Sequence, residues 1–93
     1  MSEYFTFEVI PTDNPEVREF VTNQRLTDGE EEIYPTPESG EVGSPIAQTL
    51  FFGVEGIRAL TLVDDTLIVT RQADVPWEML SDDIRDCLRD FFL

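Results

Sequence analysis

Histidine and lysine are absent from the 93-residue sequence, and Cys87 is its only cysteine. One thiol cannot close a disulfide within the chain, and a zinc or iron–sulfur site would need about four thiolate or imidazole ligands. Without histidine, the usual general base for nucleophilic catalysis is missing too. The sequence also lacks a glycine-rich phosphate loop and the spaced carboxylates of a calcium loop. We therefore expect no catalytic site, no metal site and no cofactor.

Long apolar runs are absent as well. No stretch approaches the about 18 apolar residues of a membrane-spanning helix, and the first residues lack the basic start of a signal peptide. Hydrophobic residues make up 41% of the chain and aromatic residues 11%, which is enough for one modest core. We expect a single domain over residues 1–93, located in the cytoplasm and making no direct contact with a membrane.

Positive charge is scarce. Twenty acidic residues oppose six arginines, so the net charge is −14 at pH 7. Such a surface repels the phosphates of nucleic acids, which argues against direct nucleic-acid binding. Two interpretations of the acidity are open: adaptation to a salt-rich (halophilic) cytoplasm, or a nucleic-acid mimic that occupies a basic cleft on a partner. Acidic residues occur in every segment rather than in one stripe, which favours adaptation to salt.

The N-terminal half predicts two strands and a loop. Residues 4–10 alternate apolar and polar side chains as a strand does, and residues 11–15 contain the prolines of a turn. Residues 17–25 predict a second strand, antiparallel to the first. Prolines and glycines mark residues 27–43 as a mobile surface loop, in which residues 30–34 could form a short edge strand.

The C-terminal half predicts two helices. Ser44 followed by Pro45 is typical of a helix start, and this helix should last about two to three turns. The second helix begins either after Pro76 or, with Ser81 as its cap, one turn later. Cys87 lies on this helix, where it is expected to fill the core as a small hydrophobe. The apolar stripe of the second helix consists of Trp77, Leu80, Ile84, Leu88 and Phe91.

Between the helices, residues 57–63 and 66–72 predict a hairpin around a tight turn. Four apolar side chains then share one face, because Leu62 lies opposite Leu67 and Leu60 opposite Val69. The element order is ββ-α-ββ-α. The predicted fold class is α+β, an antiparallel four-stranded sheet with two helices packed on one face.

Three ordered stretches carry a family resemblance: TDNP at 12–15, SPIAQTLF at 44–51 with VEGI at 54–57, and LIVTR at 67–71 with VPWE at 75–78. In this order and spacing the chain resembles the N-terminal domain of the Nfu (NifU-related) iron–sulfur cluster scaffold proteins. The resemblance covers nearly the whole chain.

The sequence departs from the family pattern in three places. Asp13 stands where the family usually has proline, the hairpin tip lacks a common glycine, and residues 38–43 are richer in glycine than the corresponding segment. Full-length members also carry a C-terminal domain whose Cys-x-x-Cys pair holds the cluster, and these 93 residues contain no such pair. The resemblance therefore implies a stand-alone copy of the accessory domain.

The turn residues and the first helix start are candidates for a binding surface. Thr12, Asn14 and Pro15 follow a strand, and Ser44 heads a helix whose free N–H groups suit an anion or a peptide. We expect these residues to form one surface for a partner, although turn formation and helix capping alone would also account for them.

Arg58 and Arg71 are a second candidate. The hairpin register places them opposite each other near the end of the leucine face, and two facing cations need a negative group between them. That group is either a local carboxylate or a bound anion, since the planar guanidinium suits carboxylates and phosphates.

The resemblance implies a non-enzymatic accessory module in iron–sulfur cluster assembly or delivery. It would act by contacts with assembly proteins or client apoproteins and would not hold the cluster itself. One alternative is a domain that binds an anionic ligand, or a phosphorylated or acidic peptide, through the arginine pair. The acidic nucleic-acid mimic is a further alternative.

Overall fold

A computed structural model describes residues 5–92 as a five-stranded antiparallel sheet in the strand order β1-β2-β5-β4-β3. The two long-range neighbours β2 and β5 pair at the centre of the sheet, so the N-terminal hairpin joins the C-terminal one there. The strands are β1 (Phe7–Pro11), β2 (Val17–Thr22), β3 (Glu32–Tyr34), β4 (Ile57–Val63) and β5 (Thr66–Arg71).

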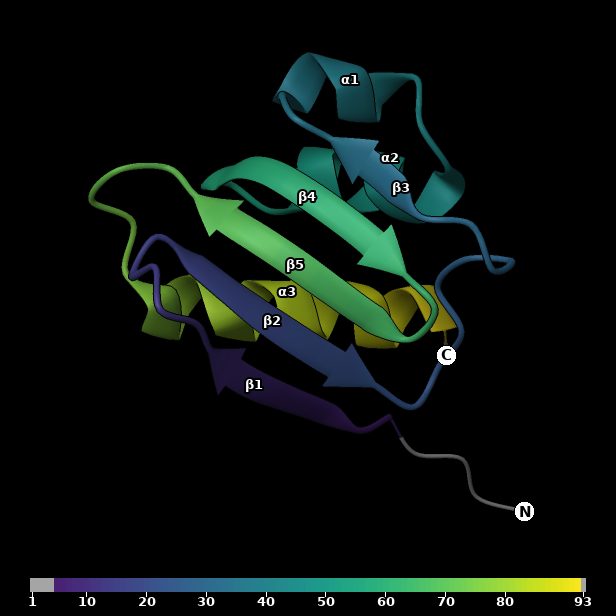
Figure 1. The fold of residues 1–93 in the computed structure, drawn as a ribbon, viewed down its shortest axis with the longest axis horizontal. Coiled ribbons are helices and arrows are strands. Elements are labelled where there is room, and N and C mark those ends of the chain that lie inside the picture. The colour runs from purple at the N-terminus through teal and green to yellow at the C-terminus, as the bar shows by residue number, and fades with distance from the viewer. Residues whose placement is uncertain (1–4, 93) are drawn as a thin grey trace.

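Three helices complete the fold: α1 (Pro37–Glu41), α2 (Pro45–Gly53) and α3 (Trp77–Phe92). Figure 1 shows α2 and α3 together behind the sheet, with its other face uncovered and α1 at the edge beside β3. The predicted α+β class with two helices on one face is thus confirmed. Ser44 caps α2 by accepting a hydrogen bond from the Ala47 N–H, as its position predicts.

The two N-terminal strands differ slightly from the prediction. Strand β1 begins at Phe7 and ends at Pro11, and Tyr4 of the predicted strand lies outside the described residues. Strand β2 ends at Thr22 rather than at residue 25. The Thr22 N–H donates to the Asp65 carbonyl and the Leu26 N–H to the Asp64 carbonyl, so the chain bends around the tip of the β4–β5 hairpin.

The segment 27–43 contains a strand and a short helix, so it is not a loop throughout, and its predicted mobility stays a prediction. Its residues 32–34 form β3, the expected edge strand, which pairs with β4 and makes the sheet five-stranded rather than four-stranded. Thr36 and Ser39 form a capping box that starts α1. Gly40 lies so close to the Phe51 ring that a side-chain carbon there would clash with it, so the absent side chain lets α1 dock on α2.

The hairpin forms in the predicted register up to its last pair. Leu62 faces Leu67 and Leu60 faces Val69, but an irregularity between residues 57 and 59 places Ile57, not Arg58, opposite Arg71. The extra residue resembles a β-bulge, which breaks the alternation of faces. As a result Ile57 is buried and Arg58 is exposed. The predicted opposition of Arg58 and Arg71 is therefore wrong.

One hydrophobic core lies between the sheet and the helices. Every second side chain of a strand points to the face of the sheet that the helices cover, and every third or fourth side chain of α3 points back to that face, so these side chains pack together. Its largest fully buried members are Phe20, Leu50, Leu60, Leu62, Leu67, Leu80, Ile84, Leu88 and Val69.

Gly56 offers a test of the connection between α2 and β4. Its φ is +104°, and an added side-chain carbon would lie 2.8 Å from Val75 Cγ1, whereas Gly29 has a φ of +101° and open space around it. Gly29→Ala should lower the free energy of unfolding by about 1–2 kcal/mol through backbone strain alone. Gly56→Ala should cost about 1–3 kcal/mol more because it also overpacks the site. Denaturant unfolding of both variants measures this, and equal losses would contradict the packing argument.

Candidate interaction site at the β1–β2 turn

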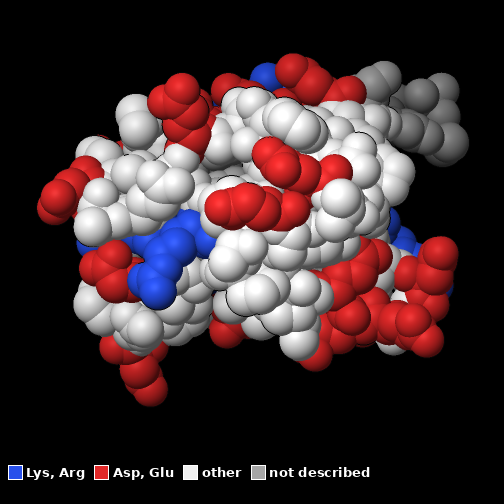
Figure 2. Space-filling model, turned by 90° about the horizontal axis from the view of Figure 1, so that it is seen from above, with Lys and Arg blue, Asp and Glu red and all other residues white. Residues whose placement is uncertain are grey.

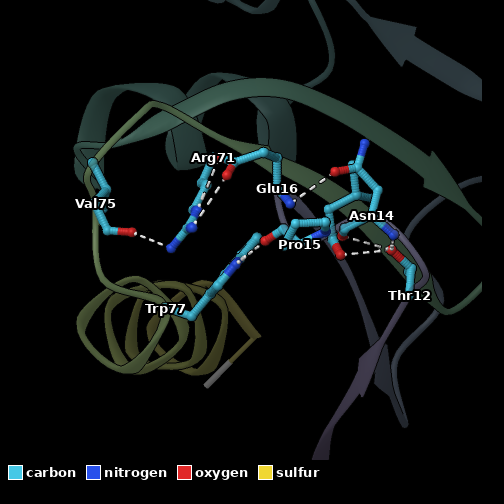
Figure 3. A network of polar contacts seen from close by, with 8 residues as sticks. Thr12, Asn14, Pro15, Glu16, Arg71, Val75 and Trp77 are labelled. Atoms are coloured by element: carbon cyan, nitrogen blue, oxygen red, sulfur yellow. Dashed lines mark hydrogen bonds and ion pairs between the residues drawn. The ribbon is translucent and has the colours of Figure 1, made fainter.

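The β1–β2 turn is held by hydrogen bonds within itself (Figure 3). The Thr12 hydroxyl accepts from the Asn14 N–H at 3.2 Å and donates to the Val17 carbonyl at 2.8 Å. The Asn14 side-chain oxygen accepts from the Glu16 N–H at 2.9 Å, and its carbonyl accepts from the Val17 N–H at 3.0 Å. Asp13, Asn14 and Pro15 are nevertheless exposed, so the turn presents a fixed polar surface.

Trp77 fixes the turn to the rest of the protein. Its indole Nε1–H donates to the Pro15 carbonyl at 2.8 Å, a bond between residues 62 positions apart. The ring is buried, with its centroid 6.1 Å from that of Phe20. The guanidinium carbons of Arg18 and Arg71 lie 5.1 Å and 5.6 Å from the indole centroid, within the range of cation–π attraction.

Glu16 and Arg71 form the second attachment of the turn. Arg71 Nε donates to one carboxylate oxygen at 3.1 Å and Nη2 to the other at 3.2 Å, which is the two-point geometry that suits guanidinium and carboxylate. The remaining terminal nitrogen, Nη1, donates to the Val75 carbonyl at 2.9 Å. The backbone N–H of Arg71 also donates to the Glu16 carbonyl at 2.9 Å.

This pairing shifts both titrations. Hydrogen bonds from Arg71 hold the pKa of Glu16 below its ordinary value of 4.5, the positive charges of Arg71 and Arg58 act in the same direction, and burial opposes them. The hydrogen bond to Glu16 raises the pKa of Arg71. The bulge nevertheless removes Arg58 from the position opposite Arg71. Of the two partners considered for Arg71, a local carboxylate or a bound anion, the structure shows a local carboxylate, that of Glu16.

Ser44 lies at the other end of the molecule, so the predicted single surface with the turn does not form. Ser44 lines a hollow together with Phe91, near the end of α3, whereas Pro15 is bound to Trp77 at the start of α3. Trp77 and Phe91 are 14 positions apart, which corresponds to about 21 Å of helix. Ser44 caps α2, and its backbone N–H donates to the Tyr34 hydroxyl.

Sequence reasoning missed Glu16, Arg18 and Val75 as parts of this site. The available signal was the register of β2 on β5, which pairs Val17 with Thr70 and so brings Glu16 beside Arg71. That register joins residues 55 positions apart and leaves no local pattern in the sequence.

Cys87 lies half-buried on α3, with its sulfur 3.6 Å from the Thr49 carbonyl oxygen. Burial, together with the negative charge of Asp90, raises the pKa of the thiol, so the thiolate that metals and electrophiles require is disfavoured. Within residues 5–92, no three His, Cys, Asp or Glu side chains are placed to hold a metal ion. Over the same residues, the structure contains no helix that is both long and apolar enough to cross a membrane.

The fold and this turn define a small two-layer α+β module. Its sequence matches the family described as "Scaffold protein Nfu/NifU N terminal" over residues 7–93. The chain belongs to this family, which implies a role in iron–sulfur cluster scaffolding or assembly. The family is generally non-catalytic. No curated protein matches the chain in sequence.

Solved structures show the same fold. A NifU-like protein from Saccharomyces cerevisiae superposes with a TM-score of 0.77 at 20% identity, covering 97% of this chain and 82% of that one. A protein from Staphylococcus aureus gives 0.68 at 15% identity, covering 87% and 94%. One from Staphylococcus epidermidis gives 0.58 at 17% identity, covering 90% and 94%. At these identities the likeness is one of fold.

Trp77→Phe tests the attachment of the turn through the indole N–H. The variant keeps an aromatic ring but loses the bond to Pro15, so the free energy of unfolding should fall by about 1 kcal/mol. The Val17 amide should exchange its hydrogen faster, because it closes the loosened turn. Tyr34→Phe is the matched control, since it removes a buried hydroxyl at the other end of the sheet. Equal exchange at Val17 in both variants would contradict the role of Trp77.

Glu16→Gln tests the ion pair through pH. Because the folded-state pKa of Glu16 lies below the unfolded value, the pair stabilises the fold above pH 4.5, and this contribution is lost as pH falls through the folded-state pKa. The free energy of unfolding of the native protein should therefore exceed that of the variant near neutral pH, and the gap should shrink in acid. Glu8→Gln, at an exposed strand position, is the control. A gap that does not change with pH would count against the pair.

Proposed function

We propose that this chain is a non-enzymatic interaction module in iron–sulfur cluster assembly or delivery, and that it works in the cytoplasm. It contacts assembly proteins or client apoproteins, for which the cluster is cargo, through the β1–β2 turn. The observation that carries the proposal is the turn itself: residues 12–15 are held from beneath by Trp77 and Arg71 while Asp13 and Asn14 face solvent.

A fixed turn suits protein recognition because the loop is already ordered before the partner binds, so binding loses little conformational entropy. Asp13 and Asn14 offer a carboxylate and an amide, which recognise basic and polar groups on another protein. Arg71 supports the turn from below rather than facing a ligand, because the Glu16 carboxylate occupies its two-point donor edge. Family membership supplies the process in which such contacts would be used.

The scarcity of cysteine and histidine also supports a role in which the chain contacts cluster-binding proteins and does not ligate the cluster itself. A cluster needs about four thiolate or imidazole ligands, and these 93 residues offer one cysteine and no histidine. Two copies of the chain would together supply only two thiols.

The test is capture from a cell extract in high salt, with mass spectrometry and an iron assay on the eluate. We expect iron–sulfur carriers or apoproteins to be enriched on the native chain, which itself should carry no iron after purification. Asp13→Arg should reduce their capture by about fivefold, because it reverses one charge at the turn surface.

Asp28→Arg is the matched control, since Asp28 is an exposed aspartate outside the turn and the substitution changes the net charge equally. Loss of capture in both variants would assign the effect to net charge and contradict the role of the turn. Absence of iron–sulfur proteins from every eluate would overturn the proposed function.

A further inference from the structure

A groove of about 760 Å³ lies between α2 and α3. Its α2 side includes Thr49 and Gly53, and Cys87 of α3 also lines it. The buried side chains of α3 are at positions 77, 80, 84 and 88, whereas its groove residues include positions 79, 83, 86 and 90, on another side of the same helix. The residues at these four positions therefore lie outside the buried side of α3, and none of the residues that line the groove belongs to the β1–β2 turn.

Exposed apolar side chains mark the two ends of this groove. Met79 is 50% exposed and Phe91 is 40% exposed, although both line the groove. Phe52 of α2, next to Gly53, is 73% exposed. Exposed apolar groups gathered at a concave surface, rather than scattered singly, are typical of interaction sites. The flexible thioether of Met79 adapts to different apolar partners.

Carboxylates surround these apolar anchors. Glu55, Asp83 and Asp90 line the groove, and within residues 5–92 none of the three forms an ion pair. Asp86 is different because it pairs with Arg89 at 3.2 Å and with Arg85 at 3.6 Å. The groove thus combines an apolar contact surface with unpaired negative charge, in a chain whose surface is already acidic.

We propose that this groove binds a basic amphipathic helix of a partner protein. Its apolar face would lie on Met79 and Phe91, and its lysine or arginine side chains would pair with Glu55, Asp83 and Asp90. The span suits a helix: Met79 and Phe91 are 12 residues apart on α3, about 18 Å, which corresponds to about three turns of a second helix lying alongside. The charge excludes an acidic or nucleic-acid occupant.

Cys87 gives the proposal a direct reporter, because the only thiol of the chain lines the groove. The thiol is neutral and half-buried, so it forms part of the apolar floor, and an occupant would cover it. Binding elsewhere on the acidic surface would leave the thiol as accessible as before. Protection of Cys87 from a thiol reagent therefore separates groove binding from general attraction to a protein of charge −14.

The experiment uses a synthetic helix of about 18 leucine and lysine residues with leucines at i, i+3, i+4 and i+7. The comparison peptide has the same composition in scrambled order, so it keeps the charge and loses the apolar stripe. At saturation the amphipathic peptide should slow modification of Cys87 on the order of tenfold, since only the free fraction reacts. The scrambled peptide should not protect. Equal protection by both peptides, or none by either, overturns the proposal.

Two pairs of substitutions locate the charge contribution. Asp83→Asn with Asp90→Asn should weaken binding of the amphipathic peptide by about fivefold. The control, Glu30→Gln with Glu31→Gln, removes the same charge from exposed positions outside the groove and should weaken binding by less than about twofold at physiological salt.

Met79→Gln should also weaken binding, whereas Val42→Gln, at a residue 85% exposed outside the groove, should not. Equal effects of test and control variants overturn the proposal.

The inference deepens the proposed function by naming a surface and the chemistry of its partner, and it rests on that function. The same variants in the capture experiment keep the two separable. If assembly proteins are still captured while the peptide leaves Cys87 unprotected, the groove proposal fails and the proposed function stands. If the peptide protects Cys87 but no iron–sulfur protein is captured, the proposed function fails and the groove remains a basic-helix site.

Discussion

The position of Trp77 is the constraint on which the arrangement of this protein depends. Its ring is buried against Phe20 of the central strand β2, its indole N–H is bonded to the β1–β2 turn, and its own residue begins α3. A single side chain thus fixes the angle at which the helix leaves the sheet and the conformation of the turn. An aromatic side chain suits this role because its large apolar body fills the core while its one polar atom reaches a defined acceptor.

Two of the arginines contact this indole, and two more form ion pairs along the helix that Trp77 begins. Arg18 and Arg71 lie over the indole, and Arg85 and Arg89 pair with aspartates along α3, so four of the six cations are engaged within the structure. Carboxylates are left in excess over the surface. On the face seen in Figure 2 they form several separate groups around apolar and neutral regions rather than one continuous stripe. This distribution resembles a solvated acidic surface more than the regular phosphate spacing that a nucleic-acid mimic would need.

Local signals in the sequence predicted the elements whose geometry is local. The Ser44–Pro45 helix start and the pairing of Leu62 with Leu67 depend on neighbouring residues, and both are observed. The irregularity at Arg58 was not predictable from the alternation of apolar residues, because strict alternation from Leu62 and Leu60 continues to Arg58, whereas the register shift places Ile57 on the buried face instead. Likewise α1 depends on the close approach of Gly40 to the Phe51 ring. In the sequence alone, the same glycine indicates a flexible loop rather than a tightly packed helix.

The candidate site shows the same limit at longer range. Thr12, Asn14 and Pro15 were identifiable from turn chemistry, but their support by Glu16, Arg71 and Trp77 arises only when β2 pairs with β5. Because of this pairing, Arg71, which was expected to face Arg58, instead binds Glu16 and supports the turn. Carboxylates also line the groove between α2 and α3, none of whose lining residues belongs to the turn. A module of this kind can separate a rigid recognition turn from an adaptable acidic groove, because the residues that line the groove lie at positions 49–55 and 79–91, outside the turn and its supports Glu16, Arg71 and Trp77.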